Sequence, residues 1–322
     1  MRPAVVIPAR VRCVRIDRFA ANLGRALRTE AAAARTTRGR AGMTALPAVI
    51  RSDYRRGDDA PPGPIEATFA APGPAATTTT DIAGTDGKAR FQIFHPTDLG
   101  AGERRLPIVT WGNGSKATPA SYPGLLPHLA SWGFVVIAST SRKTGTGAEI
   151  LAGAQHLLAE DDRPGSPFAG RLDTRHVGAV GHSQGAGGVV RATIASAGLI
   201  TTTVPINLPH RTWVSPGDEY DDLARIDGSV LLLTGALDLM AAGPGAMAGF
   251  YEELRGPAAM AALRGAGHIA VQGKGRRYLG YVTAWLRFQL AADSEAARAF
   301  TGPDAELLTN SNWTGQATKG LA

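Results

Sequence analysis

Apolar segments of strand length alternate with segments of helical periodicity between residues 105 and 292. FVVIAST (134–140) and SVLLLTG (229–235) are apolar runs of strand length, and GAEILAGAQHLLAE (147–160) carries its apolar residues at helical spacing. Strands of this kind, separated by helices, are typical of parallel sheets. The alternation therefore predicts an α/β fold with a mainly parallel central sheet and helices on both faces.

Composition divides the chain of 322 residues into four parts. Residues 1–42 form a basic tail rich in Arg and Ala, and residues 43–87 form an extended lead-in rich in Pro, Gly and Thr. This composition leaves room in the lead-in for one edge strand near residues 65–70. Residues 88–299 hold the α/β domain, and we expect the polar segment 300–322 to be a tail packed on that domain.

The positive charge of the chain belongs to the basic tail. Residues 1–42 contain ten arginines against Asp17 and Glu30, a balance of +8, so the remaining residues contribute −1 to the formal total of +7. A nucleic-acid-binding domain carries positive charge on its folded surface, so the sequence argues against a nucleic-acid partner. Arginines interrupt the apolar stretch of the tail, which therefore does not match a secretory signal. We expect either a disordered extension or coding sequence upstream of a start at Met43.

Cysteine content bears on the cellular compartment of the protein, and hydropathy bears on whether the chain spans a membrane. Cys13, in the basic tail, is the single cysteine, so the α/β domain has no disulfide and no thiolate metal site. This fits a reducing compartment and favours the cytoplasm, but exported proteins without disulfides leave the localisation open. No apolar run reaches the ~18 residues that a membrane-spanning helix needs. We expect a monomer without a membrane span.

A serine stands between glycines where an apolar strand meets a helix. HVGAVGH (176–182) has the character of a strand, and GAGGVVRATIASAG (185–198) has the character of a helix. Ser183 lies between them in GHSQG (181–185), which matches the motif G-x-S-x-G. Such a turn is sharp, so the residues two before and two after the serine must be small. It holds the serine Oγ at the carboxyl end of the sheet, beside a helix N-terminus, and makes Ser183 the candidate nucleophile.

Two residues later in the chain complete a catalytic set with Ser183. A serine hydroxyl needs a base to take its proton, and the base needs an acid to hold its tautomer. In proteins with this turn the chain order is Ser, then Asp or Glu, then His. Asp238 follows the strand 229–235, and His268 is the single histidine after Asp238. The sequence predicts a triad of Ser183, Asp238 and His268, with His182 pointing away into packing or a hydrogen bond.

Two backbone N–H groups are expected to stabilise the negative charge that develops on the substrate oxygen. One belongs to the residue after the nucleophile, Gln184, and the other belongs to the loop after an earlier strand. IVTWGNGSKA (108–117) supplies such a loop, in which Gly112 and Gly114 allow close approach of the backbone. The N–H groups of Asn113 and Gln184 are therefore the predicted oxyanion hole.

With these features the chain resembles the α/β-hydrolase superfamily over roughly residues 88–292. The narrower resemblance is to the branch that holds cutinase-like polyester hydrolases, dienelactone-hydrolase-like proteins and chlorophyllase-like proteins. It rests on WGNGSKATPASYPGLLPHLASWGFVVIAST (111–140), VGHSQGAGG (180–188) and LLLTGALD (231–238). The resemblance implies that residues 88–299 are an α/β-hydrolase catalytic domain.

The chain departs from the polyester hydrolases at positions near the expected site. In those proteins the loop donor is usually aromatic and the residue after the nucleophile is usually methionine, whereas this chain has Asn113 and Gln184. Their substrate-stacking tryptophan has no match in INLPHRTW (206–213), and their C-terminal disulfide is impossible here. These departures bear on the substrate and leave the hydrolase class unchanged.

The interval between two late strands bears on the shape of the cleft. Residues 208–228 are about twenty residues, too few for a large cap domain, so we expect an open cleft. Trp111, His210 and Trp213 are candidate substrate-binding residues, and Tyr220 could line the cleft with them. The residues of the 208–222 loop, His210, Trp213 and Tyr220, are at least as well explained as anchors of that loop. No group of residues has zinc-ligand spacing, and no Gly-rich phosphate loop ends in Lys-Ser or Lys-Thr, so we expect no metal and no cofactor.

Together these features predict a serine carboxylic-ester hydrolase that works through an acyl-enzyme on a small-molecule or polymeric ester. One alternative is an acyltransferase with the same triad, in which an alcohol takes the place of water. The other is a non-catalytic binding protein on the hydrolase scaffold. Product analysis with added alcohols separates the acyltransferase from the hydrolase, and the absence of turnover would favour the binding protein.

Overall fold

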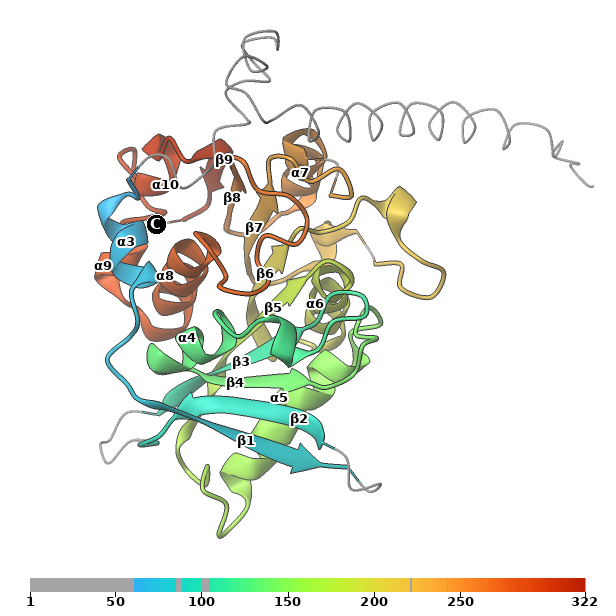
Figure 1. The fold of residues 1–322 in the computed structure, drawn as a ribbon, viewed down its shortest axis with the longest axis vertical. Helices are drawn as coiled ribbons and strands as arrows, with labels where there is room; N and C mark the ends of the chain where they lie inside the picture. The colour runs from blue at the N-terminus through green and yellow to red at the C-terminus, as the bar shows by residue number, and fades with distance from the viewer. Residues whose placement is uncertain (1–60, 85–88, 100–104, 221, 242, 322) are drawn as a thin grey trace, which may run out of the picture. The chain divides into compact units, whose positions relative to one another are not determined.

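The computed structural model of the protein describes residues 61–84, 89–99, 105–220, 222–241 and 243–321. Within these residues the strands form one nine-stranded sheet in the order β1-β2-β4-β3-β5-β6-β7-β8-β9 (Figure 1). The strands are β1 (Thr77–Ala83), β2 (Ala89–Pro96), β3 (Leu106–Gly112), β4 (Val135–Ser139), β5 (Leu172–His182), β6 (Ile200–Ile206), β7 (Ser229–Gly235), β8 (Ala258–Leu263) and β9 (Trp313–Lys319). The basic tail expected over residues 1–42 lies outside the described residues.

The centre of the sheet is parallel, and both edges are antiparallel. The six strands from β4 to β8 in the sheet order pair in parallel, whereas β1, β2 and β9 pair antiparallel with their neighbours. The predicted α/β fold with a mainly parallel sheet is confirmed. In register, Gly112 lies beside Gly181 at the carboxyl ends of β3 and β5, and Ile206 lies between His182 and Leu233. The loops that follow these neighbouring strands therefore meet at one edge of the sheet.

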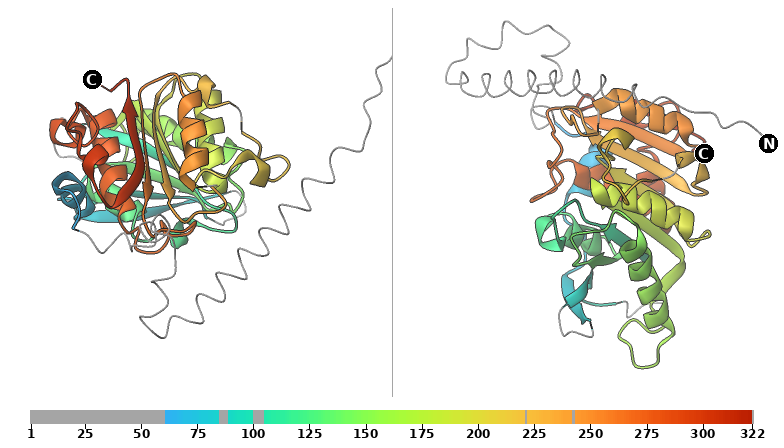
Figure 2. Two further views of the ribbon diagram at one scale, coloured as in Figure 1. Left: turned by 90° about the horizontal axis from the view of Figure 1, so that it is seen from above. Right: turned by 90° about the vertical axis from the view of Figure 1, so that its right-hand side faces the viewer.

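Helices cover both faces of the sheet, as the two views in Figure 2 show. One face carries α3 (Pro64–Ala70), α4 (Leu126–Ser131) and α8 (Tyr278–Ala291). The other face carries α5 (Ala148–Asp162), α6 (Gln184–Ala195) and α7 (Gly243–Glu253). The shorter helices are α9 (Ser294–Ala297) and α10 (Glu306–Thr309).

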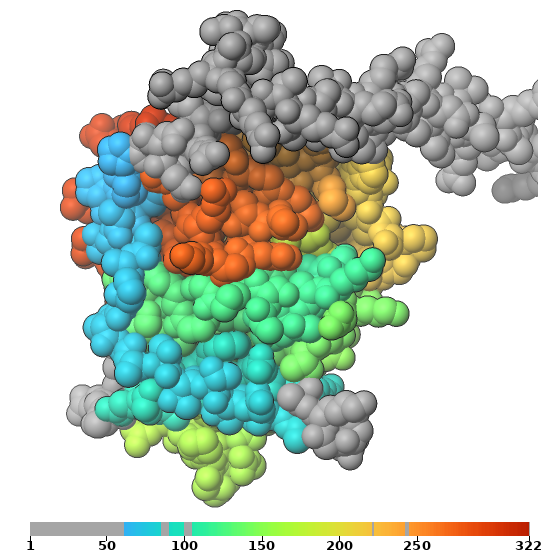
Figure 3. Space-filling model, in the orientation of Figure 1, coloured from blue at the N-terminus to red at the C-terminus, as the bar shows by residue number. Residues whose placement is uncertain are grey.

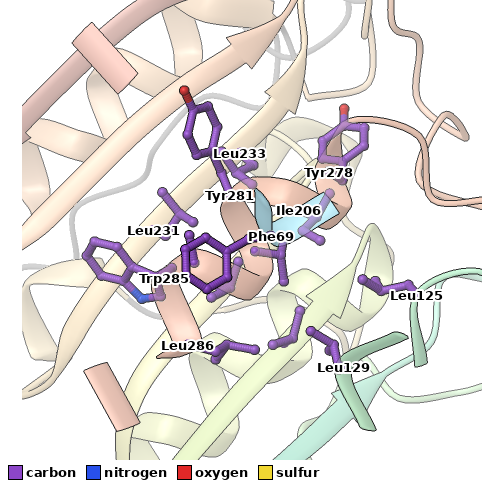
Figure 4. Close-up of a cluster of buried hydrophobic side chains, with 14 of the residues drawn as sticks. Phe69, Leu125, Leu129, Ile206, Leu231, Leu233, Tyr278, Tyr281, Trp285 and Leu286 are labelled. Carbon is purple, nitrogen blue, oxygen red and sulfur yellow. The ribbon is translucent and has the colours of Figure 1, made fainter. Parts of the chain in front are cut away.

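The largest core cluster lies between the sheet and the α3–α4–α8 layer. Trp285 and Leu286 of α8 are fully buried there together with Leu231 of β7 and Phe69 of α3 (Figure 4). Burial of each such side chain contributes about 1.5–3 kcal/mol to folding. This layer fixes the strands whose carboxyl ends carry the candidate site.

Residues 64–70 form helix α3, and not the edge strand expected near residues 65–70. Pro64 occupies a first-turn position of this helix, where its missing N–H costs nothing. The Glu306 carboxylate accepts hydrogen bonds from the N–H groups of Ile65 (2.6 Å) and Glu66 (2.8 Å) and so caps the helix. A residue 240 positions away supplies this cap, which is why local composition did not reveal it.

Two segments expected to lie outside the sheet are strands of it. Residues 77–83, expected in the extended lead-in, form β1, which pairs with β2. Residues 313–319, expected in a tail packed on the domain, form β9, which pairs with β8. Trp313 of β9 is 1% exposed, and its burial anchors the segment that composition alone marked as polar.

Loops follow the carboxyl ends of the strands, and two of them lie against one another. Between β6 and β7 the described residues contain only the 3-10 turns η3 (Arg211–Trp213) and η4 (Leu223–Arg225), so no cap domain stands there. The loops after β3 and β8 are joined by two backbone hydrogen bonds, from Gly124 N–H to the Gly273 carbonyl and from Gly273 N–H to the Ser121 carbonyl. In Figure 3 these segments, blue-green and orange, lie against each other on the face in view.

Candidate active site

Ser183 stands on a strained turn between β5 and α6. Its backbone has φ 55° and ψ −121°, a conformation that non-glycine residues rarely adopt. A Cβ at position 181 would overlap the carbonyl oxygen of Gly185, and a Cβ at position 185 would overlap that of Gly112. The packing therefore requires glycine at both positions, as the sequence analysis expected.

The structure brings Ser183, His268 and Asp238 together in one hydrogen-bonded line. Ser183 Oγ lies 2.7 Å from His268 Nε2, and His268 Nδ1 lies 2.8 Å from Asp238 Oδ2. The Asp238 side chain is fully buried, whereas that of His268 is 18% exposed. Asp238 Oδ1 accepts hydrogen bonds from the N–H groups of Met240 (2.9 Å) and Ala241 (3.0 Å). These bonds fix the carboxylate, which in turn orients the imidazole toward the serine.

The backbone carbonyl of His268 is held by two further side chains. His182 Nε2 lies 2.7 Å from this oxygen, and Asn207 Nδ2 lies 2.5 Å from it. Asn207 directly follows β6, and its Oδ1 accepts a hydrogen bond from Gly235 N–H at the end of β7 (3.0 Å). Asn207 thus ties the loop of His268 to the ends of two strands.

His182 links the loop of His268 to the loop after β3. Gly114 N–H donates to the Tyr122 hydroxyl oxygen (2.9 Å), so the Tyr122 O–H is available to donate to His182 Nδ1 (2.9 Å). His182 Nδ1 then accepts, and its Nε2–H donates to the His268 carbonyl. The side chain points away from the serine into this chain of hydrogen bonds, which fixes one neutral tautomer.

Burial makes His182 a contributor to the pH dependence of stability. Desolvation, reinforced by the nearby His268, lowers the pKa of His182 from 6.5 to about 4. The unfolded chain therefore binds a proton near pH 6.5 that the folded chain binds only near pH 4. The free energy of unfolding should fall by about 3 kcal/mol as the pH drops through this window. Urea unfolding at a series of pH values measures this loss.

The matched variant for this prediction is His182→Gln, which has no group that titrates in the window. Its unfolding free energy should depend less steeply on pH between 6.5 and 4 than that of the wild type. Part of the slope should remain, because burial also lowers the pKa of His128. Equal slopes in the wild type and the variant would contradict the prediction.

The predicted oxyanion donors lie on either side of the turn. Gln184 is the first residue of α6, and the first N–H groups of a helix have no acceptor within the helix. The side chain of Asn113 is fully buried, accepts a hydrogen bond from Trp111 Nε1 (2.9 Å) and donates to the Ser139 carbonyl (2.6 Å). Asn113 can therefore offer only its backbone to a substrate. Its carbonyl accepts from Thr144 Oγ1 (2.7 Å), which fixes the loop.

A pocket opens beside Ser183, which is itself one of the residues that line it. Its apolar walls include Trp213, Tyr220 and Met240, and its polar walls include Ser115, Gln184 and Asp218.

Trp213 is the one of the three predicted substrate-binding side chains that lines this pocket. Trp111 was expected at the cleft but is fully buried in the core, where its ring packs edge-on against Tyr122 at 4.6 Å. His210 is outside the lining. It caps η3 by accepting from Thr212 N–H (3.4 Å), which is the loop-anchoring role that the sequence analysis left open.

Neither metal-binding clusters nor membrane-spanning helices occur in the part of the chain that the structure describes. No three His, Cys, Asp or Glu side chains there are grouped so that they could hold a metal ion. None of the described helices combines the length and the apolar character that crossing a bilayer requires.

The fold and the serine turn define an α/β-hydrolase. A sequence profile described as PET hydrolase-like (PETase) matches residues 50–316. The chain therefore belongs to the PET hydrolase-like family, and its expected place in the cutinase-like branch of the superfamily is confirmed.

Two relatives illustrate the similarity. The chain is 30% identical over 147 residues to a bis(hydroxyethyl) terephthalate hydrolase of Streptomyces coelicolor, a match that covers 43% of this chain and 44% of the relative. It is 28% identical over 277 residues to a cutinase of Thermobifida fusca, a match that covers 82% of this chain and 84% of the relative. The chain thus spans less than half of the first relative and most of the second.

Three residues of the site were missed by sequence reasoning. Asn207 stands directly after a parallel strand, where ligand-facing residues concentrate, and this position could have singled it out. Tyr122 carries no such signal, because its role depends on His182, 60 positions away. Asp218 belongs to the acidic run of Asp218, Glu219, Asp221 and Asp222, which the sequence alone does not distinguish from a solvated loop.

Proposed function

We propose that the protein is a serine hydrolase that cleaves carboxylic esters through an acyl-enzyme intermediate. The observation that carries this proposal is the line of hydrogen bonds from Ser183 Oγ through His268 to Asp238, with distances of 2.7 and 2.8 Å. These contacts fall within the range for a nucleophile, its base and the acid that orients the base. The strained backbone at Ser183 supports a functional role for the turn.

In the first half of the reaction, Ser183 Oγ attacks the ester carbonyl carbon while His268 Nε2 takes the hydroxyl proton. The bond to the leaving alcohol then breaks, and His268 returns the proton to the alcohol oxygen. In the second half, water attacks the acyl-serine, with His268 again acting as the base. The products are a carboxylic acid, an alcohol and free Ser183. Asp238 stabilises the imidazolium that forms at each step.

The backbone N–H groups of Gln184 and Asn113 are the proposed donors to the oxyanion. The missing Cβ at Gly185 lets the turn pack directly against the Gly112 and Asn113 carbonyls, so both donors come from adjoining backbone. Preorganised donors of this kind contribute typically about 10²–10³ each in turnover. Because both donors belong to the main chain, they stay in place in side-chain variants.

An ester with an apolar portion fits the surroundings of the proposed nucleophile. Three large apolar side chains are strongly exposed in the described chain, and all three adjoin the acid or the base: Leu239 (49%), Met240 (42%) and Ile269 (66%). Such a rim favours contact with apolar material, either a small molecule or a polymer. The names of the relatives, a cutinase and a bis(hydroxyethyl) terephthalate hydrolase, support an ester substrate as well.

Covalent labelling tests this proposal without knowledge of the natural substrate. A fluorophosphonate probe should modify the protein once, and peptide mapping should place the adduct on Ser183. The same preparation should release p-nitrophenol from p-nitrophenyl butyrate, and labelling should abolish that release in proportion. An adduct on Ser115 or Ser215, which also line the pocket, would contradict the proposal. So would an unlabelled folded protein without esterase activity.

A further inference from the structure

Among the described residues that line the pocket beside Ser183, one carries a charge. Asp218 is the single carboxylate in this described lining, which contains no Lys, Arg or Glu. Asp218 belongs to the connection between β6 and β7, which also brings Trp213 and Tyr220 to the pocket. The proposed reaction gives Asp218 no part, so its presence calls for a different explanation.

Neighbouring groups hold Asp218 in a defined position. Its Oδ2 accepts a hydrogen bond from Gln184 Nε2 (2.7 Å), and Gln184 Oε1 accepts from Thr144 N–H (3.2 Å). Arg191 Nη1 donates to the carbonyls of Gly217 (2.8 Å) and Glu219 (2.9 Å), on either side of Asp218 in the chain. Asp218 therefore lines the pocket from a fixed loop, with its carboxylate held by Gln184.

The negative charge of Asp218 is not neutralised by an ion pair among the described residues. Its side-chain partner there is the amide of Gln184, which is neutral. The Nη1 group of the nearby Arg191 donates its two described hydrogen bonds to backbone carbonyls. Arg211 forms a two-point ion pair with Glu253, with both distances 2.6 Å. Among the described residues that line the pocket with Ser183, Asp218 is therefore the one that carries a formal charge, and no described ion pair engages it.

Aromatic rings in the same pocket add to the attraction for positive charge. Trp213 and Tyr220 both line it, and the faces of aromatic rings attract cations. The Arg211 guanidinium lies 5.3 Å from the centre of the Tyr220 ring, so this ring already has a cationic neighbour. Because Trp213 and Asp218 line the same pocket, a positively charged group there would lie near both an aromatic ring and a carboxylate.

We propose that Asp218 makes this pocket selective for the charge of the ester. Esters that carry an alkylammonium group in the pocket are preferred over neutral esters of the same shape, and esters that carry a carboxylate are disfavoured. This inference rests on the proposed hydrolysis at Ser183 and names the substrate class that the site favours. A carboxylate attracts a cation and repels an anion through the same field, so one residue produces both effects.

Three p-nitrophenyl esters of matched length test the proposal. Their acyl groups are γ-trimethylammoniobutyrate, its uncharged analogue with a tert-butyl group in place of trimethylammonium, and hemiglutarate. The wild type should show kcat/KM in the order cation, neutral, anion, with steps of about tenfold, the size expected for one partly solvated charge interaction plus contact with an aromatic face. In Asp218→Asn, whose amide oxygen can still accept from Gln184, the ratios should fall toward one, with only the preference of the aromatic face for the cation remaining. Added salt should reduce them in the wild type.

Glu252→Gln is the matched control, because it removes one negative charge from an exposed residue of α7 outside the pocket. This variant should keep the wild-type ratios. Equal kcat/KM for the three esters in the wild type would overturn the proposal. Ratios that persist unchanged in Asp218→Asn would overturn it too.

A binding experiment separates this proposal from the proposed hydrolysis. In Ser183→Ala, calorimetry should show phenyltrimethylammonium binding more tightly than benzoate, and the added Asp218→Asn change should weaken the cation about tenfold. If no ester is hydrolysed but this difference is found, the hydrolase proposal fails and the charge selectivity stands. If esters are hydrolysed but neither the ratios nor the binding depend on Asp218, the charge selectivity fails alone.

Discussion

Replacing Ser183 by alanine is expected to lower kcat for p-nitrophenyl butyrate by on the order of 10⁶, to near the background rate. The substitution removes the only oxygen that His268 Nε2 contacts at 2.7 Å among the described residues, so no acyl-enzyme can form. KM should change much less, because the walls of the pocket remain. Initial rates under saturating substrate, with active enzyme counted by a covalent probe in the wild type, give the required comparison.

His268→Ala should cause a loss of similar size, and the double variant should be no worse than either single variant. The two residues act as one unit, since the serine is a poor nucleophile without the base, and without the serine there is no hydroxyl proton for the base to accept. Ser294→Ala, at an exposed position in α9, serves as the control and should keep wild-type turnover. Losses that multiply in the double variant would show that the two residues act independently, contrary to the triad.

The strand, turn and helix around Ser183 could be predicted because the constraint is local. Gly181 and Gly185 lie within two residues of the serine, and the packing that excludes a Cβ at each involves this same turn and the neighbouring Gly112. The later partners could be named because chain order left one choice of histidine after Asp238. Local sterics and chain order are both properties that a sequence displays directly.

The direction of a buried side chain was not predictable in the same way. Trp111 lies in β3, and alternate residues of a strand point to opposite faces, so Trp111 shares its face with Val109. That face packs on the layer that contains α8, not on the cleft. Because β3 is buried on both faces, its sequence shows no alternation that would have revealed this.

Contacts between distant segments also escaped prediction. Asn207 and His182 reach the His268 carbonyl across 61 and 86 positions of the chain, and Glu306 caps α3 across 240. No local sequence feature near these residues indicates which distant residue each of them contacts. Such contacts follow from the order of the strands in the sheet, which the alternation of elements does not specify.

Replacing Glu66 by alanine is expected to lower the free energy of unfolding by about 3–5 kcal/mol, the usual cost of removing one partner from a buried charged network. The Glu66 side chain is fully buried in α3. Its carboxylate accepts from Trp313 Nε1 (3.0 Å) and Asn310 Nδ2 (2.8 Å) and pairs with Arg277 (3.3 Å). Alanine would leave these donors without that acceptor in the interior. Urea unfolding at neutral pH measures the loss.

Two comparisons give this prediction its specificity. Glu295→Ala removes an exposed carboxylate from α9 and should change the unfolding free energy by less than about 0.5 kcal/mol. Glu66→Gln keeps one acceptor oxygen but places its NH₂ group opposite another donor. Its free energy of unfolding should therefore lie between those of the wild type and Glu66→Ala. A Glu66→Ala protein within 1 kcal/mol of the wild type would contradict the role assigned to the network.

The same variant separates stability from catalysis. Glu66 joins α3 to the start of α8 and to the beginning of β9. Ser183, Asp238 and His268 instead follow strands β5, β7 and β8. Well below its midpoint of thermal unfolding, Glu66→Ala should therefore keep kcat within about threefold of the wild type while its midpoint falls. A loss of kcat as large as that of Ser183→Ala in protein that is still folded would mean that the network also positions the triad.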